Sequence, residues 1–193
     1  MKIYFDGCSY TEGKNYLGDD YKNLRWSKLL CDKLDAEEYN YSDSGSSNQR
    51  MLRNLATEHC NKDYDLAIIQ LSYPSRNEFY NGTYFEQVNN NIKRTVKKYT
   101  SRNNSMSVSL AWQMYYRNIY EREYGLAYEL TVFNSIKYIC QAKNIKLIML
   151  SCWGSTKLPY DHMLSNYEPV SKDNGHPNVN AQKLIANDIY NLL

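Results

Sequence analysis

Residue types suited to nucleophilic catalysis lie at two distant places in the chain. Ser9 follows the strand-like run Lys2–Asp6 and Gly7, so a turn there would present its hydroxyl at the edge of a sheet. A serine in such a place acts as a nucleophile when a base reaches it. Asp173 and His176 lie three residues apart near the C-terminus. That spacing lets the carboxylate bond one imidazole nitrogen and leaves the other free as a base.

Two further stretches carry groups that could complete such a site. Residues 42–48 form a small-residue turn around Gly45, whose backbone N–H groups could point into the same crevice because no side chain of the glycine blocks them. Arg76 could clamp a carboxylate, phosphate or sulfate on a substrate. A surface salt bridge from Arg76 to Glu78 or Glu12 is the alternative interpretation.

The cysteines and the other histidines form no recognisable site. Their odd number and the lack of a C-x-x-C pair favour reduced thiols over a disulfide framework or a zinc site. The five cysteines are Cys8, Cys31, Cys60, Cys140 and Cys152. We interpret His59, near a predicted helix end, and His162, beside Asp161, as structural or solvated. The sequence therefore predicts neither a metal ion nor a cofactor.

Strand-like and helix-like segments alternate along the chain. The strands are expected at Lys2–Asp6, Glu38–Ser42, Leu66–Leu71 and Lys146–Ser151, and the helices at Asn23–Leu34, Ser47–Cys60, Thr83–Tyr99 and Pro177–Leu193. This alternation predicts an α/β fold with a mostly parallel sheet of four or five strands and helices on both faces. In such sheets ligands bind at the carboxyl ends of the strands, which is where the loops containing Ser9 and Gly45 begin.

Length and composition are those of one globular domain spanning residues 1–193. The 42% hydrophobic and 23% charged residues fit neither a disordered nor a fibrous protein. A formal net charge of +2 argues against a dedicated nucleic-acid binder, and no apolar run reaches the ~18–20 residues of a membrane span. The N-terminus shows no signal-peptide pattern, so we expect a cytoplasmic protein or a virion component, and the 20 tyrosines suit an AT-rich phage, virus or bacterium.

A helical, aromatic-rich insertion is expected around residues 103–143. Its aromatic residues recur at intervals of four, at Trp112, Tyr116, Tyr120, Tyr124 and Tyr128. We interpret this stripe as a helix face packed on the domain, interrupted at Gly125; a platform that stacks on substrate is the alternative.

Three motifs together resemble the SGNH (GDSL-like) hydrolase family. They are the Gly-x-Ser that ends at Ser9, the turn at Gly45, and the Asp-x-x-His-Pro from Asp173 to Pro177 with the helix after it, in the right order over nearly the whole chain. The resemblance implies a flavodoxin-like three-layer α/β/α sandwich and a metal-independent serine esterase or other acyl hydrolase, for example a carbohydrate O-deacetylase. It implies Ser9 as nucleophile, His176 as general base and Asp173 as its orienting carboxylate, with the N–H groups of Ser9 and Gly45 in the oxyanion hole.

The chain departs from the family pattern in two places. Cys8 replaces the aspartate of the usual Gly-Asp-Ser, and residues 70–78 lack the Gly-x-Asn-Asp block whose asparagine donates to the oxyanion. Losing one such donor costs about 2.7–4 kcal/mol of transition-state stabilisation. We expect Ser72, Asn48 or Arg76 to substitute for it, in a protein that acts on a small-molecule or carbohydrate ester.

Three alternative functions are compatible with the same residues. Cys8 could be the nucleophile in place of Ser9, since thiolates are intrinsically strong nucleophiles. The chain could be a catalytically weak or inactive binding module for a virion, carbohydrate or protein partner, which the missing asparagine would explain. A nucleotide-binding protein is disfavoured because the first loop lacks the Gly-x-Gly-x-x-Gly spacing.

Overall fold

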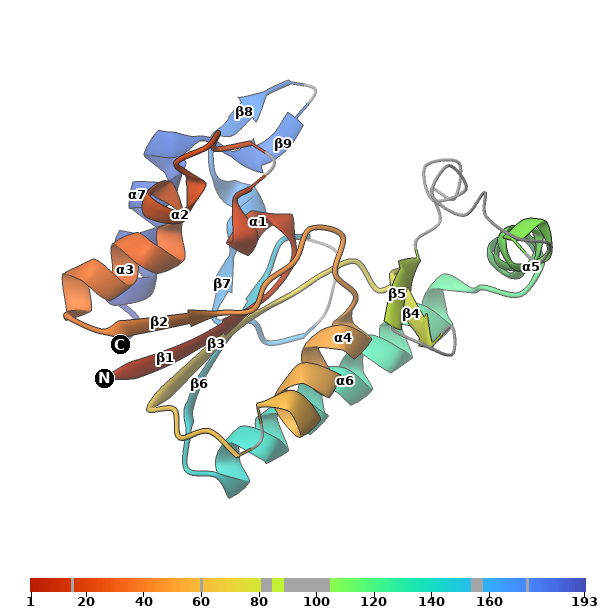
Figure 1. Ribbon diagram of the computed structural model, residues 1–193, viewed down its shortest axis with the longest axis horizontal. Coiled ribbons are helices and arrows are strands. Elements are labelled where there is room, and N and C mark those ends of the chain that lie inside the picture. The colour runs from red at the N-terminus through yellow and green to blue at the C-terminus, as the bar shows by residue number, and fades with distance from the viewer. Residues whose placement is uncertain (15, 60, 81–84, 89–104, 154–157, 173) are drawn as a thin grey trace.

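A parallel five-stranded sheet forms the centre of the computed structural model (Figure 1). The structure describes residues 1–14, 16–59, 61–80, 85–88, 105–153, 158–172 and 174–193. The strands of this sheet are β1 (Lys2–Asp6), β2 (Glu37–Asn40), β3 (Leu66–Leu71), β6 (Lys146–Ser151) and β7 (His162–Met163). They run in the order β2-β1-β3-β6-β7, and every neighbouring pair is parallel.

This strand order is the flavodoxin-like one, and it confirms the predicted fold class. The chain adds β2 on one side of β1 and then returns to add β3 on the other, so the order reverses between β1 and β3. Ligands of open parallel sheets bind outside the carboxyl ends of the strands at such a reversal. Ser9 follows β1 and Ser72 follows β3, so both residues lie at this point.

Helices cover both faces of the sheet, as Figure 1 shows. They are α1 (Ser9–Glu12), α2 (Tyr21–Leu24), α3 (Trp26–Leu34), α4 (Asn48–Arg53), α5 (Ser105–Asn118), α6 (Arg122–Ala142) and α7 (Val179–Tyr190), with a π-helical turn at Asn54–Glu58 and a 3₁₀ turn at Leu164–Asn166. Helices α3 and α7 pack on one face, and α4 and α6 on the other. None of the helices formed by the described residues is both long and apolar enough to cross a membrane.

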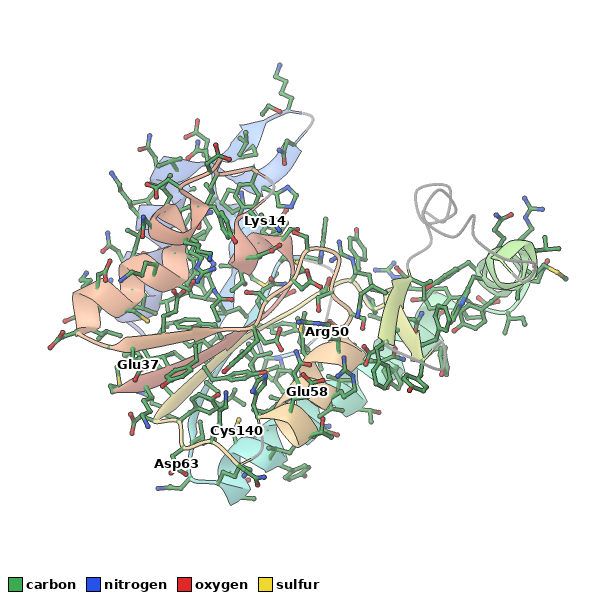
Figure 2. The ribbon with its side chains drawn as sticks, in the orientation of Figure 1. Lys14, Glu37, Arg50, Glu58, Asp63 and Cys140 are labelled. Atoms are coloured by element: carbon green, nitrogen blue, oxygen red, sulfur yellow. The ribbon has the colours of Figure 1, made fainter. Side chains whose placement is uncertain are left out.

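The alternation of side chains along β1 explains the two cores. Successive residues of a strand point to opposite faces, so Ile3 and Phe5 pack toward α3 and α7 whereas Tyr4 packs toward α4 and α6. All six residues of β3 are buried, as expected of a strand covered on both sides. Figure 2 shows the side chains that fill both layers, including the buried Cys140 on α6.

Several predicted boundaries differ from the structure. The helix expected from Asn23 is divided, because Arg25 has an extended backbone and α3 begins at Trp26. Ser47 caps α4 by accepting a hydrogen bond from the Arg50 N–H and so lies before the helix. The last helix begins at Val179, after the cap residue Asn178.

The helix predicted at Thr83–Tyr99 is wrong in the four residues that the structure describes. Phe85–Val88, within the helix expected at Thr83–Tyr99, is strand β5, which pairs antiparallel with β4 (Asn77–Tyr80); residues 83, 84 and 89–99 lie outside the described residues. The aromatic stripe is divided between α5 and α6 at residues 119–121. Gly125 does not interrupt it, because this glycine lies within α6 against the Tyr120 hydroxyl.

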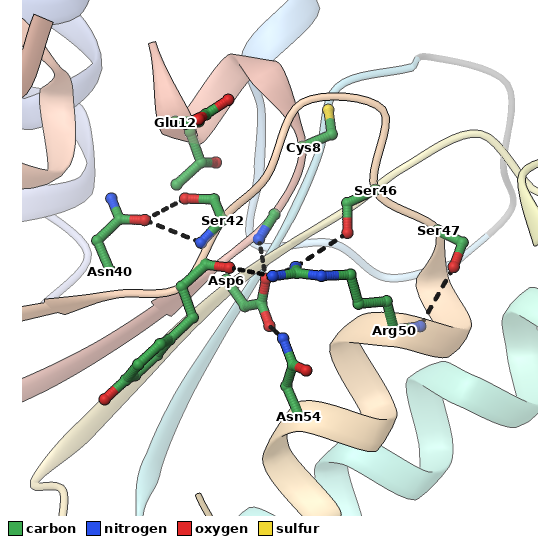
Figure 3. A network of polar contacts seen from close by, with 12 residues as sticks. Asp6, Cys8, Glu12, Asn40, Ser42, Ser46, Ser47, Arg50 and Asn54 are labelled. Carbon is green, nitrogen blue, oxygen red and sulfur yellow. Dashed lines mark hydrogen bonds and ion pairs between the residues drawn. The ribbon is translucent and has the colours of Figure 1, made fainter. Parts of the chain in front are cut away.

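A buried ion pair fixes the end of β1 to the layer of α4 (Figure 3). The fully buried Asp6 carboxylate accepts hydrogen bonds from Arg50 Nη1 at 3.1 Å, Asn54 Nδ2 at 2.9 Å and the Tyr4 hydroxyl at 3.0 Å. It also accepts the N–H of Gly7 at 2.8 Å. Burial raises the pKa of the Asp6 carboxyl, and the Arg50 guanidinium opposes that shift. The four donors thus hold the turn that leads to Ser9.

Asp6→Ala is expected to lower the free energy of unfolding by about 3–5 kcal/mol, because it leaves the Arg50 guanidinium largely buried without its partner. Urea unfolding followed by circular dichroism measures the change. Asp32→Ala, which removes an exposed ion pair with Lys28 on α3, is the control and should leave stability nearly unchanged. Equal effects of the two substitutions would contradict a structural role for the buried pair.

Candidate active site

Ser9 and His176, which are 167 residues apart in sequence, meet at the carboxyl edge of the sheet. Ser9 Oγ lies 2.7 Å from His176 Nε2. Ser9 begins α1 after β1, and His176 lies in β9 (Asn174–Pro177), which pairs antiparallel with β8 (Pro169–Ser171) before the last helix. The structure therefore brings together the two residues predicted as nucleophile and base.

The second imidazole nitrogen is bonded to a residue that the sequence did not single out. His176 Nδ1 lies 2.6 Å from Asn174 Oδ1. The amide oxygen can only accept, so Nδ1 carries the proton and Nε2 accepts the Ser9 hydroxyl proton. Asp173, the predicted orienting carboxylate, lies outside the described residues. The sequence signal for Asn174 was its amide two residues before His176. The Asp-x-x-His spacing favoured the neighbouring Asp173 instead.

Gln70 anchors the turn that presents Ser9. Its Oε1 accepts the Cys8 N–H at 3.0 Å and the Thr11 hydroxyl at 3.1 Å. A Cβ on Gly7 would lie 2.9 Å from the same oxygen and 2.7 Å from the Thr11 hydroxyl, so only glycine allows this approach. Gln70 is fully buried, and a polar residue within the apolar run of β3 was its sequence signal.

The Gly45 turn is attached directly to the Ser9 turn. The Asp43 N–H donates to the Gly7 carbonyl at 3.1 Å, and the Glu12 carboxylate accepts the Ser44 N–H at 2.9 Å. Gly45 has a φ of +86°, which a side chain would strain. These bonds place the second predicted oxyanion element beside α1.

Asn48 and Ser72, two of the three predicted substitute donors, are bonded to each other. Asn48 Oδ1 accepts the Ser72 N–H at 2.7 Å, and Asn48 Nδ2 donates to the Ser72 carbonyl at 3.1 Å. Both residues are buried. The Ser72 hydroxyl accepts a hydrogen bond from Arg76 Nη1 at 2.6 Å, so all three predicted substitutes are in one group.

Neither of the predicted salt-bridge partners pairs with Arg76. Glu78 is held by Arg53 through two bonds, of 3.0 and 3.2 Å, and the Glu12 carboxylate is bonded to Ser44. The interpretation of Arg76 as part of a surface salt bridge to Glu78 or Glu12 is therefore wrong. Its guanidinium lies near the site, bonded to the Ser72 hydroxyl.

Aromatic rings enclose His176 and the neighbouring edge. The Tyr16 ring stacks on the imidazole with centroids 4.6 Å apart, and the Tyr10 ring lies at 4.8 Å. The Tyr73 and Trp153 rings lie 4.1 Å apart, after β3 and β6. This cover lowers the pKa of His176 below its ordinary value of 6.5, chiefly by burial; Cys8 opposes the shift and the Arg76 cation adds to it.

Cys8 points toward another cysteine. Its Sγ lies 3.9 Å from the Cys152 Sγ, and both residues are fully buried, whereas Ser9 Oγ contacts His176. This arrangement favours Ser9 over Cys8 as the group that the base reaches.

All four described cysteines are free thiols, and the described residues contain no group of three or more His, Cys, Asp or Glu side chains placed to hold a metal ion.

The other two histidines, His59 and His162, contact tyrosines away from the Ser9–His176 pair. His59 stacks on the Tyr41 ring with centroids 3.7 Å apart, and His162 Nε2 is bonded to the Tyr167 hydroxyl. Neither contacts Ser9 in the described part of the chain.

Comparisons with known proteins identify the fold. No protein-family model matches the chain, and the search of curated proteins finds no match. Among solved structures, a carbohydrate esterase aligns with a TM-score of 0.59 and 12% identity over 99% of this chain and 67% of its own. The lipase Lip_vut3 from a goat rumen metagenome aligns with a TM-score of 0.54 and 12% identity over 98% of this chain and 95% of its own. The chain thus has the fold of SGNH/GDSL-like hydrolases.

Arg76→Gln is expected to raise the pKa of His176, because removing a nearby cation stabilises the imidazolium. NMR titration of the histidine ring resonances measures the pKa in the wild type, which should lie below 6.5, and in the variant. His162 is the internal control, because burial lowers its pKa and Asp188 opposes that shift, with no contribution from Arg76. Its pKa should be the same in the wild type and the variant. An unchanged His176 pKa in the variant would show that the Arg76 charge does not act at the imidazole.

Proposed function

We propose that this chain, which has the SGNH/GDSL-like hydrolase fold, is a serine ester hydrolase that works through an acyl-enzyme. The observation that carries the proposal is the 2.7 Å contact between Ser9 Oγ and His176 Nε2 at the carboxyl edge of the sheet. A hydroxyl bonded to a neutral imidazole is the arrangement that nucleophilic acyl transfer requires.

The reaction would proceed in two halves. Ser9 Oγ attacks the ester carbonyl while His176 Nε2 takes its proton, giving a tetrahedral oxyanion. Collapse of this species breaks the bond to the leaving oxygen, which receives the proton from His176. Water then attacks the acyl-enzyme with the same base, releasing the acid and restoring Ser9. A His176 pKa below its ordinary value keeps the base neutral at neutral pH.

The oxyanion hole would be formed by backbone and side-chain donors. The N–H groups of Ser9 and Gly45 are the first two, as the family resemblance implies. The Ser72 hydroxyl accepts from Arg76 and can therefore point its own proton toward the oxyanion, and Asn48 Nδ2 keeps a second hydrogen beyond its bond to Ser72. These groups would replace the missing asparagine.

The relatives in fold support an ester substrate. Of the similar structures, one is a carbohydrate esterase and another a lipase. A small-molecule or carbohydrate ester is accordingly the proposed substrate.

A non-catalytic binding module is the second candidate. The carbohydrate esterase noted above is described as having an active site with divergent catalytic and non-catalytic binding functions. The absence of the Gly-x-Asn-Asp asparagine from residues 70–78 favours this candidate, whereas the Ser9–His176 contact favours catalysis.

Ser9→Ala should lower kcat/KM for 4-nitrophenyl acetate by about 1,000-fold or more, because it removes the nucleophile. Labelling by a fluorophosphonate probe should disappear with it. Cys8→Ala is the matched control on the neighbouring residue and should retain both activity and labelling. Full activity in the Ser9 variant would contradict the proposal, and loss only in the Cys8 variant would identify the thiol as nucleophile.

Asn174→Ala should lower kcat about tenfold or more with a smaller change in KM, because the imidazole loses the acceptor that fixes its tautomer. Asp173→Ala tests the carboxylate that the family resemblance implies. A larger loss of kcat in the Asp173 variant would assign the orienting role to that residue. Circular dichroism of both variants checks that the fold is retained.

A further inference from the structure

The Arg76 guanidinium forms no ion pair with a carboxylate in the part of the chain that the structure describes. Among the described residues, its side-chain hydrogen bond runs from Nη1 to the neutral Ser72 hydroxyl, at 2.6 Å. Arginine is fully charged at neutral pH and carries five N–H donors, so most of its hydrogen-bonding capacity is unused by these contacts.

The nearby acidic side chains are already bonded to other groups. Asp6 pairs with Arg50, Glu78 with Arg53, and Glu12 with the Ser44 N–H. Among residues whose side chains are not described, only Glu86 and Asp173 are acidic, whereas residues 89–104 include five Lys or Arg and no acid. The sequence therefore offers few candidates for an internal partner of Arg76.

The position of Arg76 makes its charge effective at the reacting groups. The guanidinium lowers the pKa of His176 in addition to the effect of burial, and it opposes the increase that burial causes in the pKa of Tyr10 and of Cys152. Of those groups, His176 contacts Ser9 Oγ and Tyr10 follows Ser9 in the chain, and the Arg76 side chain is itself half-buried. An electrostatic interaction is stronger in such surroundings than in bulk water.

We propose, on the basis of the proposed esterase function, that the substrate is an ester that carries an anionic group, a carboxylate or a phosphate, and that Arg76 binds that group. A planar guanidinium fits either anion through two parallel N–H bonds. A neutral ester would offer the cation no counter-charge, so charge on the substrate would act as a specificity determinant. Arg76 would thus select the substrate while Ser9 and His176 perform the chemistry.

Two pairs of esters, matched except for charge, test this inference. In the first pair the acyl group differs: mono-4-nitrophenyl succinate is compared with 4-nitrophenyl butyrate. In the second the leaving group differs: 4-acetoxybenzoate is compared with 4-acetoxybenzamide. The readout is the ratio of kcat/KM for the anionic ester to that for its neutral partner, in wild type, Arg76→Gln and Arg76→Lys. Arg117→Gln removes an exposed charge from α5 and is the charge-matched control.

In wild type, the ratio should be about 10 or more in at least one pair, as expected for one charge-assisted hydrogen bond. Arg76→Gln should reduce that ratio to about 1, Arg76→Lys should retain part of it, and Arg117→Gln should not change it. No preference in either pair, or a preference that survives in Arg76→Gln, would overturn the inference.

Failure of the esterase proposal would be recognised separately. If wild type hydrolyses none of the four esters, calorimetric binding of 4-acetoxybenzoate and 4-acetoxybenzamide decides the matter. Tighter binding of the anion that is lost in Arg76→Gln would support anion recognition in a non-catalytic protein. Equal binding of the two compounds would overturn it.

Discussion

The buried carboxylate of Asp6 is the interaction on which the geometry of the site depends. A carboxylate without solvent costs several kcal/mol unless donors surround it, and here it accepts hydrogen bonds from four groups. Two of them, Arg50 and Asn54, come from the helical layer under the sheet, and one is the backbone of Gly7. The last residue of β1 is thereby fixed to the layer that supports it, and the chain can turn at once into α1.

Everything that places Ser9 builds on this fixed turn. Gln70 holds the turn from β3, and Glu12 joins α1 to the loop that contains Gly45. The hydroxyl reaches His176 because these bonds leave the start of α1 little freedom. The reversal of strand order between β1 and β3 provides the space in which these loops converge.

Two arginines near this edge have different electrostatic environments. The charge of Arg50 is balanced by Asp6 within the fold, so that residue contributes to structure. Arg76 is bonded to a neutral hydroxyl, and its charge acts on His176. The difference lies in the partner that each guanidinium has, which the identity of the residue alone does not reveal.

The sequence by itself determined the strands β1, β3 and β6, with their bounds, because apolar runs ended by polar or turn residues depend only on neighbours in the chain. The Gly-x-Ser and Asp-x-x-His motifs likewise marked Ser9 and His176. Only the tertiary structure decided that Asn174 bonds His176, that Gln70 holds the Cys8 N–H, that Glu78 pairs with Arg53 instead of Arg76, and that Phe85–Val88 is a strand. The bond between His176 and Asn174 joins residues two positions apart. The others depend on partners that local patterns do not specify, and two of them join residues 62 and 25 positions apart, where packing and charge pairing select one partner among many.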